Sequence, residues 1–376
     1  MPQHIVVVGA GVMGACTAYY LSKRATGDVR VTVVEKTAVA CGASGKAGGF
    51  LALDWNDGSE IGELTRASFN LHAELAKSLN GERYGYRRVE TYSVYLSFGS
   101  GKSNKEIPRE NSTIDWLDTK RVRSVDTLGT VDNTAQVHPE LFTHALLEDA
   151  VATGHVQVRC GQGVASLLYG DDDPTKVIGV ELDNGEKIDA DAVVICMGPW
   201  SGTLPMKGRR RNMLPITGSR AHSIVMKPEK TVPAQALFTA IADGSRIYPR
   251  PDGTVYMCGP TDTEELPQSA DQVKVDSTAT DTLRSLASKI SPILASDGTQ
   301  VVATQACYLP ISRDGVPLIG AHPNHQQLYI GTGHSCWGIL NSPITGLMLS
   351  ELLLDGRISC LDSESVEAVD PKNRCS

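Results

Sequence analysis

Two glycine-rich turns, one near each end of the 376-residue chain, have the composition of anion-binding loops. The first is GAGVMG at 9–14, and the second begins GTGHSCWGILNSPITG at 331–346. Glycine lets backbone amides approach a phosphate closely, and a helix that starts after such a turn adds the positive end of its dipole. The second turn also contains the ionisable side chains of His334 and Cys336. Both turns are candidate ligand sites, and the flanking segments indicate which ligand they bind.

The first turn lies between a predicted strand and a predicted helix, as a dinucleotide-binding turn does. The apolar run HIVVV precedes Gly9, and the stretch from Val12 onward has a helical apolar face. Gly9 allows the tight turn, Gly11 lets the backbone approach a pyrophosphate, and Gly14 lets helix and strand pack closely. Glu35 ends the next predicted strand, where a carboxylate accepts from ribose hydroxyls and repels a 2′-phosphate. The pattern predicts a dinucleotide site that disfavours NADP.

Two further segments favour FAD over a nicotinamide dinucleotide. CGASGKAGGF at 41–50 is a second loop of small residues, which brings backbone amides and the Ser44 hydroxyl toward another part of a cofactor. DADAVVICMGPWS at 189–201 predicts a buried strand that ends in a glycine turn beside the dinucleotide. Because a nicotinamide enzyme has less use for the loop at 41–50, the sequence favours a flavin.

Strands and helices alternate at both ends of the chain, and runs with antiparallel character interrupt them. Helices are expected at 60–80, 139–154, 271–290 and 339–356. Antiparallel strands are expected at 86–98 and between 215 and 262. This order predicts an α/β fold in which an antiparallel-sheet substrate domain is inserted into a parallel-sheet nucleotide domain. The predicted nucleotide domain comprises 1–85, 132–212 and 300–376, and the substrate domain comprises 86–131 and 213–299.

Composition argues against several classes of partner. A net charge of −8, a pI near 5.6 and an aromatic content of 5% give no general attraction to nucleic acid or anionic lipid. We expect the one basic cluster, KGRRRN at 207–212, to be a solvated loop. No apolar run is long enough to span a membrane. Nine cysteines without a CxxC pair favour a reducing compartment, so a cytoplasmic protein is expected, and no metal site is predicted.

Taken together, these segments resemble the D-amino-acid oxidase family of FAD-dependent oxidoreductases, in particular its glycine oxidase and sarcosine oxidase branch. That family combines GxGxxG…E with an SGxxGG-type loop, an ATGxWS-type strand end and a closing GHxxxGIxxxPxxG. The chain matches the closing motif at Gly333, His334, Gly338, Ile339, Pro343 and Gly346. LPITGSRAHSIVM at 214–226 and PISRDGVPLIG at 310–320 resemble the segments that enter and leave the substrate domain. The chain is also similar to little-characterised yeast and plant oxidoreductases of this family.

The resemblance implies a Rossmann-like FAD-binding domain of the GR2 type with FAD bound in extended form. The first glycine turn would face the pyrophosphate, Glu35 the adenosine ribose, Val164 the adenine, and the turn at 331–346 the pyrimidine end of the flavin. The cofactor-binding residues expected on this basis are Gly9, Gly11, Val12, Met13, Gly14, Glu35, Lys36, Ala43, Ser44, Lys46, Gly48, Gly49, Val164, Met197, Gly198, Trp200, Cys307, Gly333, His334, Trp337, Gly338 and Ile339. The catalytic candidates are His334, Tyr248, Arg250 and Lys46.

The substrate-binding positions depart from the glycine oxidase branch. In that branch arginines hold the substrate carboxylate, and this chain has Leu309 and Cys336 at the corresponding positions. A buried carboxylate without a partner is costly, so either the substrate is anchored elsewhere or it is not a simple amino acid. The candidates for a replacement anchor are Arg220, Arg246, Arg250, Arg313 and Lys46.

Two positions bear on how the flavin is held and reoxidised. Cys307 lies seven residues before Asp314, the spacing at which sarcosine oxidase and its relatives link FAD covalently. Non-covalent FAD, with Cys307 as a small packing residue, is the favoured alternative. Spacing along TVYMCG at 254–259 puts Met257 where those relatives have a lysine that promotes reaction with O2.

The leading hypothesis is an FAD-dependent oxidoreductase that oxidises the C–N bond of a secondary amine or N-substituted amino acid. The resemblance implies hydride transfer to the flavin, with O2 as an acceptor. Two alternatives stay open: a dehydrogenase of another small metabolite, and a flavin-binding regulatory or trafficking protein with little catalysis. The expected partner is a small amine or amino-acid-like molecule.

Overall fold

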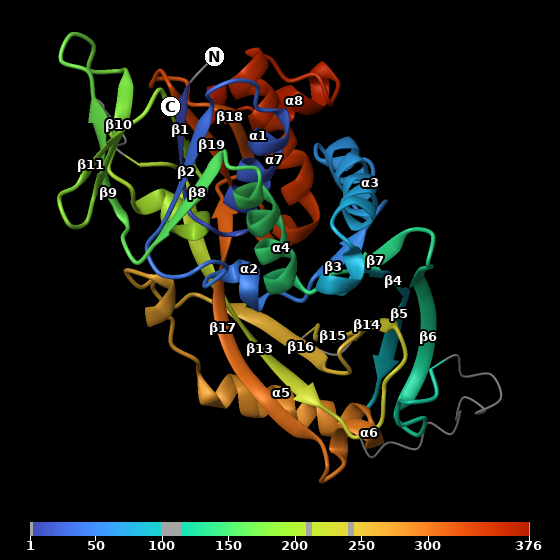
Figure 1. Ribbon diagram of the computed structural model, residues 1–376. Helices are drawn as coiled ribbons and strands as arrows, with labels where there is room; N and C mark the ends of the chain where they lie inside the picture. Colours follow the sequence, from blue (N-terminus) through green and yellow to red (C-terminus); the bar gives the residue numbers. More distant parts are fainter. Residues whose placement is uncertain (1–2, 99–113, 208–212, 240–243, 376) are drawn as a thin grey trace.

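The computed structural model describes residues 3–98, 114–207, 213–239 and 244–375. Figure 1 shows a parallel sheet with its helices above a second, larger sheet, and one long helix beneath that second sheet. Residues 208–212 of the basic cluster lie outside the described residues. No helix in the described ranges is long and apolar enough to cross a membrane.

The upper sheet is built from strands that are apolar on both faces, as buried parallel strands are. Its order is β18-β19-β12-β1-β2-β8, and β18 alone runs antiparallel to its neighbour. The strands are β1 His4–Val8, β2 Arg30–Glu35, β8 Val156–Cys160, β12 Ala192–Ile195, β18 Leu318–Ala321 and β19 Leu328–Thr332. In this order β1 and β19 lie on either side of β12 and run parallel to it. The two glycine-rich turns, which follow β1 and β19, therefore lie at the same edge of the sheet.

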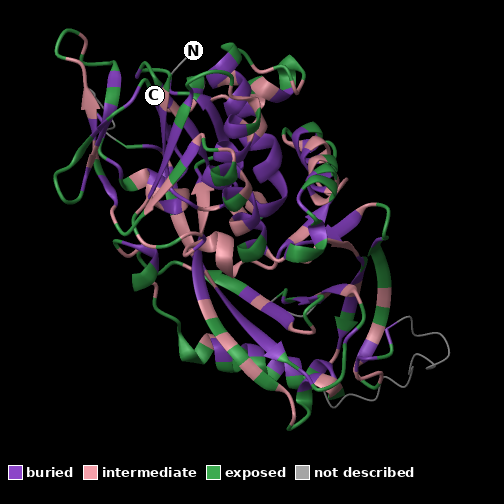
Figure 2. Cartoon of the chain, in the orientation of Figure 1, coloured by how far each residue is buried: buried purple, intermediate pink, exposed green. Residues whose placement is uncertain are grey.

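Helices cover one face of the parallel sheet, and a small antiparallel sheet covers the other. The helices are α1 Val12–Arg24, α3 Gly62–Ser78, α4 Pro139–Ala152 and α7 Gly338–Asp355. They share one hydrophobic core with β1 and β2. The small sheet packs on the opposite face and comprises β9 Val164–Tyr169, β10 Val177–Leu182 and β11 Lys187–Asp189. Figure 2 shows α1 and α7 buried along most of their length.

The close approach of α1 and α7 depends on a glycine. A Cβ added at Gly346 would lie 2.5 Å from the carbonyl carbon of Cys16 and 2.6 Å from its oxygen. Only a residue without a side chain therefore fits at this crossing. The two helices begin at the two glycine-rich turns, so the crossing holds those turns next to each other.

Pro343 lies inside α7 and has no N–H group to donate to the carbonyl of Ile339. His72 Nε2 from α3 lies 3.0 Å from that carbonyl, and Ser342 Oγ donates to it at 2.9 Å. Ser68 Oγ donates to the next carbonyl, that of Leu340, at 2.7 Å. His72 of α3 thus contacts the carbonyl that loses its helical partner, and α7 continues without a break.

The lower sheet has seven strands in the order β17-β13-β16-β15-β14-β5-β6. These are β5 Glu90–Leu96, β6 Val122–Gly129, β13 Ile216–Lys227, β14 Gln235–Thr239, β15 Arg246–Pro249, β16 Val255–Asp262 and β17 Gln300–Ser312. One face packs on α5 Ser277–Ile290 and α6 Pro292–Ala295. The other face carries Tyr248 and Tyr256 toward the parallel-sheet half of the molecule.

Short elements connect the two halves. The helix α2 Ala43–Lys46 lies between them, next to β17. A three-stranded sheet is formed by β3 Phe50–Ala52, β4 Arg87–Arg88 and β7 Thr134–Gln136. The helix α8 Ser363–Val369 packs near the end of the chain.

The α/β fold with a parallel sheet and a second, largely antiparallel sheet is confirmed. The predicted helices at 60–80, 139–154, 271–290 and 339–356 correspond to α3, α4, α5 and α7. The division into domains stays a prediction. The predicted boundary at residue 300 falls at the start of β17, which pairs along its length with β13 of the lower sheet. If the domains are divided by sheet, the chain returns to the nucleotide domain only after Ser312.

The packing of α1 on α7 predicts that Gly346→Ala will destabilise the fold. The new methyl group meets backbone rather than a movable side chain, so the free energy of unfolding should fall by about 1–3 kcal/mol. Urea unfolding of the FAD-free protein measures this. Gly338→Ala in the same helix is the matched control, because its methyl would come no closer than 3.7 Å to Met13 Cε. Equal stability of both variants would contradict the packing argument.

Candidate functional site

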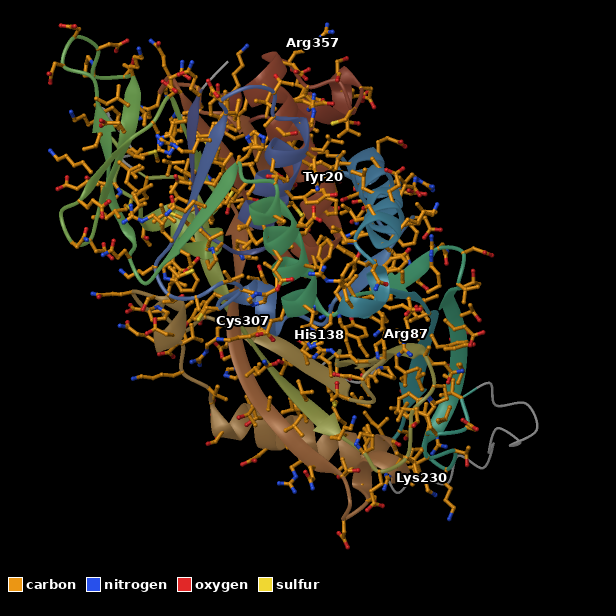
Figure 3. All side chains as sticks on the ribbon, in the orientation of Figure 1. Tyr20, Arg87, His138, Lys230, Cys307 and Arg357 are labelled. Carbon is orange, nitrogen blue, oxygen red and sulfur yellow. The ribbon has the colours of Figure 1, made fainter. Side chains whose placement is uncertain are left out.

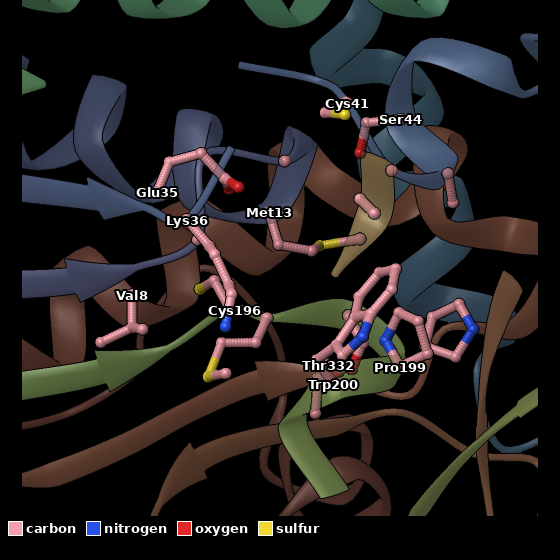
Figure 4. Close-up of a pocket in the computed structure, with 18 of the residues that line it drawn as sticks. Val8, Met13, Glu35, Lys36, Cys41, Ser44, Cys196, Pro199, Trp200 and Thr332 are labelled. Atoms are coloured by element: carbon pink, nitrogen blue, oxygen red, sulfur yellow. Dashed lines mark hydrogen bonds between the residues drawn. The ribbon is translucent and has the colours of Figure 1, made fainter. Parts of the chain in front are cut away.

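A cavity of about 520 Å³ lies where the two glycine-rich turns meet. Its walls come from the turn after β1, the end of β2, the loop around α2, the start of β9, the end of β12 and the turn before α7. Figure 4 shows Glu35 and Lys36 at the left, Met13 near the centre, Ser44 above it, and Trp200 and Thr332 below it. The cavity therefore follows the edge of the sheet at which the strands end, the usual ligand position in open α/β sheets.

The first glycine turn is held in place by two side chains from elsewhere in the chain. Glu35 Oε2 accepts from the Ala10 amide at 2.9 Å, while its Oε1 accepts from the Thr37 amide at 2.9 Å. Ser44 Oγ accepts from the Val12 amide, the first of helix α1, at 2.8 Å. Gly9 has a φ of +106°, and a Cβ there would lie 2.5 Å from the carbonyl oxygen of Cys196. The turn is thus preformed, with the positive end of α1 at the cavity wall.

An ion pair lies at the Glu35 side of the cavity. Lys36 Nζ is 3.3 Å from Asp183 Oδ2, and both residues line the cavity with Val164. Both side chains are close to half exposed, so the pair itself contributes little stability. It marks the solvent-exposed end of the cavity, where sequence analysis expects the adenosine part of a dinucleotide.

His334 lines the opposite end and has a defined tautomer. Its Nε2 lies 2.9 Å from Thr345 Oγ1, and that hydroxyl already donates to the carbonyl of Asn341 at 2.8 Å. Nε2 must therefore carry the proton and donate, which leaves Nδ1 as an acceptor. Nδ1 is buried and has no hydrogen-bond partner among the described residues. Burial lowers the pKa of His334 to about 3, so the ring is neutral at physiological pH.

These features fit FAD. A glycine-turn cradle and a helix dipole suit a pyrophosphate, and Glu35 suits a ribose hydroxyl. The unpartnered His334 Nδ1 offers an acceptor to an N–H group at the far end. All three features belong to the wall of one cavity, so one ligand could contact them together.

Most of the predicted cofactor-binding residues are brought together at this cavity. Those that line it are Gly9, Gly11, Val12, Met13, Glu35, Lys36, Ala43, Ser44, Val164, Met197, Gly198, Trp200, His334, Gly338 and Ile339. Those that do not are Gly14, Lys46, Gly48, Gly49, Cys307, Gly333 and Trp337. Gly14 instead packs the helix against the strand, because a Cβ there would lie 1.9 Å from the carbonyl oxygen of Gly9. The cofactor-binding role of each residue stays a prediction.

Tyr248 and Arg250, two catalytic candidates, lie behind the loop at 46–49 rather than in the cavity wall. The Tyr248 ring stacks on that of Tyr256 with centroids 5.9 Å apart, and a Cβ at Gly48 would lie 2.4 Å from Tyr248 Cε2. Arg250 is only 6% exposed and donates from Nη2 to the carbonyl of Ala47 at 3.2 Å. Burial lowers the pKa of this guanidinium. Both residues support the loop that lines the cavity at Ala47.

Cys307 lies at the junction of the two halves, as Figure 3 shows, but it does not line the cavity. Its thiol is buried, and burial raises its pKa to about 12. A thiol with this pKa is almost wholly protonated near neutral pH and is a poor nucleophile.

The position predicted for Met257 is wrong. Its side chain is fully buried in the core that faces α5, on the side of the lower sheet away from the cavity. Alternation along β16 instead turns Tyr256 and Cys258 toward the upper half. A one-residue error in reading a strand exchanges its two faces, which explains the wrong placement.

Several residues that line the cavity were not among the predicted cofactor-binding residues. The segment 268–270 approaches from the lower half and covers the cavity, and Trp200 Nε1 ties this segment down by donating to the carbonyl of Pro267 at 2.7 Å. Leu309, Pro310 and Thr332 also line the cavity. Leu309 and Pro310 adjoin or lie in the PISRDG segment and Thr332 lies in the second glycine turn, so both had a usable signal. The polar loop at 268–270 had none.

Residues 4–352 match the family model described as FAD dependent oxidoreductase. The chain is 33% identical to a Schizosaccharomyces pombe protein named as an oxidoreductase without a stated substrate, over 98% of each chain. It is 27% identical to the glycine oxidase of Geobacillus kaustophilus, over 93% of this chain and 92% of that one. A crystal structure of glycine oxidase from the same organism has a TM-score of 0.77 at 20% identity, covering 96% of each chain.

The buried, neutral state of His334 predicts a pH-dependent stability. The unfolded chain takes up a proton on this ring below pH 6.5, whereas the folded chain does not until about pH 3. Stability should therefore fall as pH drops from 6.5, by up to about 1.4 kcal/mol per pH unit for this group. In His334→Gln the slope between pH 4.5 and 6 should decrease by that amount in urea unfolding. A difference in the free energy of unfolding at pH 7.5 reports lost packing separately. An unchanged dependence of that free energy on pH would show that the ring of His334 titrates normally.

The protonated, buried Cys307 predicts non-covalent FAD. Acid precipitation of the holoprotein should leave a yellow supernatant and a colourless pellet, because a scarce thiolate does not attack the flavin. Cys307→Ala should release the same amount of flavin. A yellow pellet from the parent protein that turns colourless in Cys307→Ala would instead establish a covalent link.

Proposed function

Because the chain belongs to the family of FAD dependent oxidoreductases, we propose that it oxidises the C–N bond of a small amine or amino acid. A secondary amine or N-substituted amino acid is the proposed substrate class, and O2 is the proposed electron acceptor. The observation that carries the proposal is the single cavity that joins Glu35, both glycine turns and the buried His334 acceptor. The similarity to bacterial glycine oxidases supports amine chemistry.

FAD, when bound, supplies the ring that accepts the two electrons and the hydrogen from the substrate carbon. The turn at 9–13, with Glu35 and Ser44, would hold its dinucleotide part. The start of α7 and His334 Nδ1 would contact the ring at the other end of the cavity, next to Leu309 and Cys336.

The protein's own contribution is positioning and the exclusion of water. The loop at 46–49 is fixed from behind by Tyr248, Tyr256 and Arg250, so the cavity wall at Ala47 has a rigid support. His334 stays neutral and keeps its proton on Nε2, which makes Nδ1 a permanent acceptor rather than a proton donor. A preorganised wall of this kind needs no rearrangement as charge develops on the ligand.

An anaerobic reduction screen tests the proposed function. The oxidised holoprotein is mixed without oxygen with primary amino acids, N-methyl amino acids, glycated amino acids and amines that lack a carboxylate. Oxidation of a C–N bond should bleach the visible flavin band, and N-substituted compounds should bleach it fastest. Admission of air should then restore the band if O2 is the acceptor.

Dithionite is the control, because it reduces any accessible bound flavin. Bleaching by dithionite and by none of the amines would overturn the proposed function. Bleaching by an amine without recovery in air would retain amine oxidation and overturn the proposal that O2 is the acceptor.

A further inference from the structure

Arg246 lies on the face of the lower sheet that is turned toward the cavity. It begins β15, and alternation along that strand puts its side chain on the same face as Tyr248. Its neighbours across the sheet are Cys258 of β16 and Phe238 of β14, whose ring centroid is 6.0 Å from the guanidinium carbon. Burial lowers the pKa of Arg246, but the neighbouring Tyr248, Cys258 and Cys336 outweigh this and raise it. Phe238 contacts Trp55, which contacts Trp337, the residue next to the cavity-lining Cys336, so a chain of ring contacts leads from the guanidinium to the cavity wall.

Arg246 has no carboxylate partner among the described residues. The other candidate arginines are engaged or misplaced, and the remaining candidate, Lys46, lacks the paired N–H groups that match a carboxylate. Arg220 is bonded from Nε to both carboxylate oxygens of Asp262, at 3.0 and 3.1 Å. Arg250 is buried behind Ala47, and Arg313 is exposed in the turn that follows β17. Arg246 is therefore the candidate whose charge remains available to a ligand.

A cluster of aromatic side chains adjoins Arg246 through Phe238. We call Phe50, Trp55, Phe238 and Trp337 the aromatic cluster. Their centroids are 5.0 Å apart for Phe50–Trp55, 4.8 Å for Trp55–Phe238 and 6.4 Å for Trp55–Trp337. Each of these side chains is partly exposed, so the cluster presents apolar surface next to a cation. This combination suits a ligand with an anionic head and an apolar or aromatic body.

We propose that Arg246 binds the substrate carboxylate and that the aromatic cluster contacts an apolar group of the same molecule. The inference rests on the proposed function and narrows its substrate to amino acids that carry a sizeable apolar side chain or N-substituent. Arginine binds a carboxylate through two parallel N–H···O bonds, and the apolar surroundings strengthen that attraction.

Titration of the holoprotein with benzoate and with benzamide tests the proposal. The two probes have nearly the same shape, but only benzoate has a carboxylate, and binding is followed by the change in the flavin spectrum. Benzoate should bind at least tenfold more tightly than benzamide to the parent protein. Arg246→Gln should weaken benzoate at least tenfold and leave benzamide unchanged. The benzoate affinity of Arg246→Lys should lie between those of the parent protein and Arg246→Gln, since lysine keeps the charge and loses the paired N–H groups.

Arg313→Gln is the matched control, because it removes the same charge from an exposed turn and should leave both probes unaffected. Equal binding of benzoate and benzamide to the parent protein would overturn the proposal. An equal loss of benzoate affinity in Arg246→Gln and Arg313→Gln would overturn it as well. FAD content identifies a variant that fails to fold, in which case the comparison of the two probes on the parent protein decides.

The test separates this inference from the proposed function. If benzoate binding depends on Arg246 but no amine bleaches the flavin, the carboxylate site stands and amine oxidation fails. If amines without a carboxylate bleach the flavin as fast as their carboxylate counterparts, and Arg246→Gln does not change KM, amine oxidation stands and the carboxylate site fails.

Discussion

The site depends on the close crossing of α1 and α7, which Gly346 permits against the backbone of Cys16. Each helix begins at one glycine-rich turn, so the distance between the helix axes sets the distance between the turns. A side chain at the crossing would separate the two helix starts and open the cavity between them. Both turns thus contribute walls to one cavity, and Gly346, deep in the core, permits their close spacing.

The position of α7 along its own axis is fixed by polar contacts from α3. His72 contacts the Ile339 carbonyl that Pro343 leaves free, and Ser68 donates to the next carbonyl, that of Leu340. Further along the same helix, Thr65 donates to Asn341 Oδ1 at 3.3 Å, and Asn341 accepts at its carbonyl from Thr345, the partner of His334. This buried polar network runs from the α3 surface to the cavity. The network specifies one arrangement of α7 and, through Thr345, the tautomer of His334.

The sequence predicted the parts of the site that backbone conformation dictates. The turn at 9–14 and Glu35 were identifiable because a positive φ and a strand-end carboxylate restrict the residue type strongly. The segment 268–270 was not identifiable, because a polar loop that reaches the cavity from another sheet leaves no local pattern. Met257 was misplaced because alternation in a strand gives two equivalent phases, and only the tertiary structure selects one.

The two sheets divide recognition between them. The parallel half supplies the glycine turns, Glu35 and His334, and so contains the groups suited to the cofactor. The lower half supplies Arg246 and Phe238 from β15 and β14, and Arg246 is the group proposed to bind the substrate carboxylate. Leu309 and Cys336 are part of the cavity wall, whereas Arg246 on β15 is not. A carboxylate anchor on the second sheet would therefore let the substrate pocket change while the cofactor cavity keeps its shape.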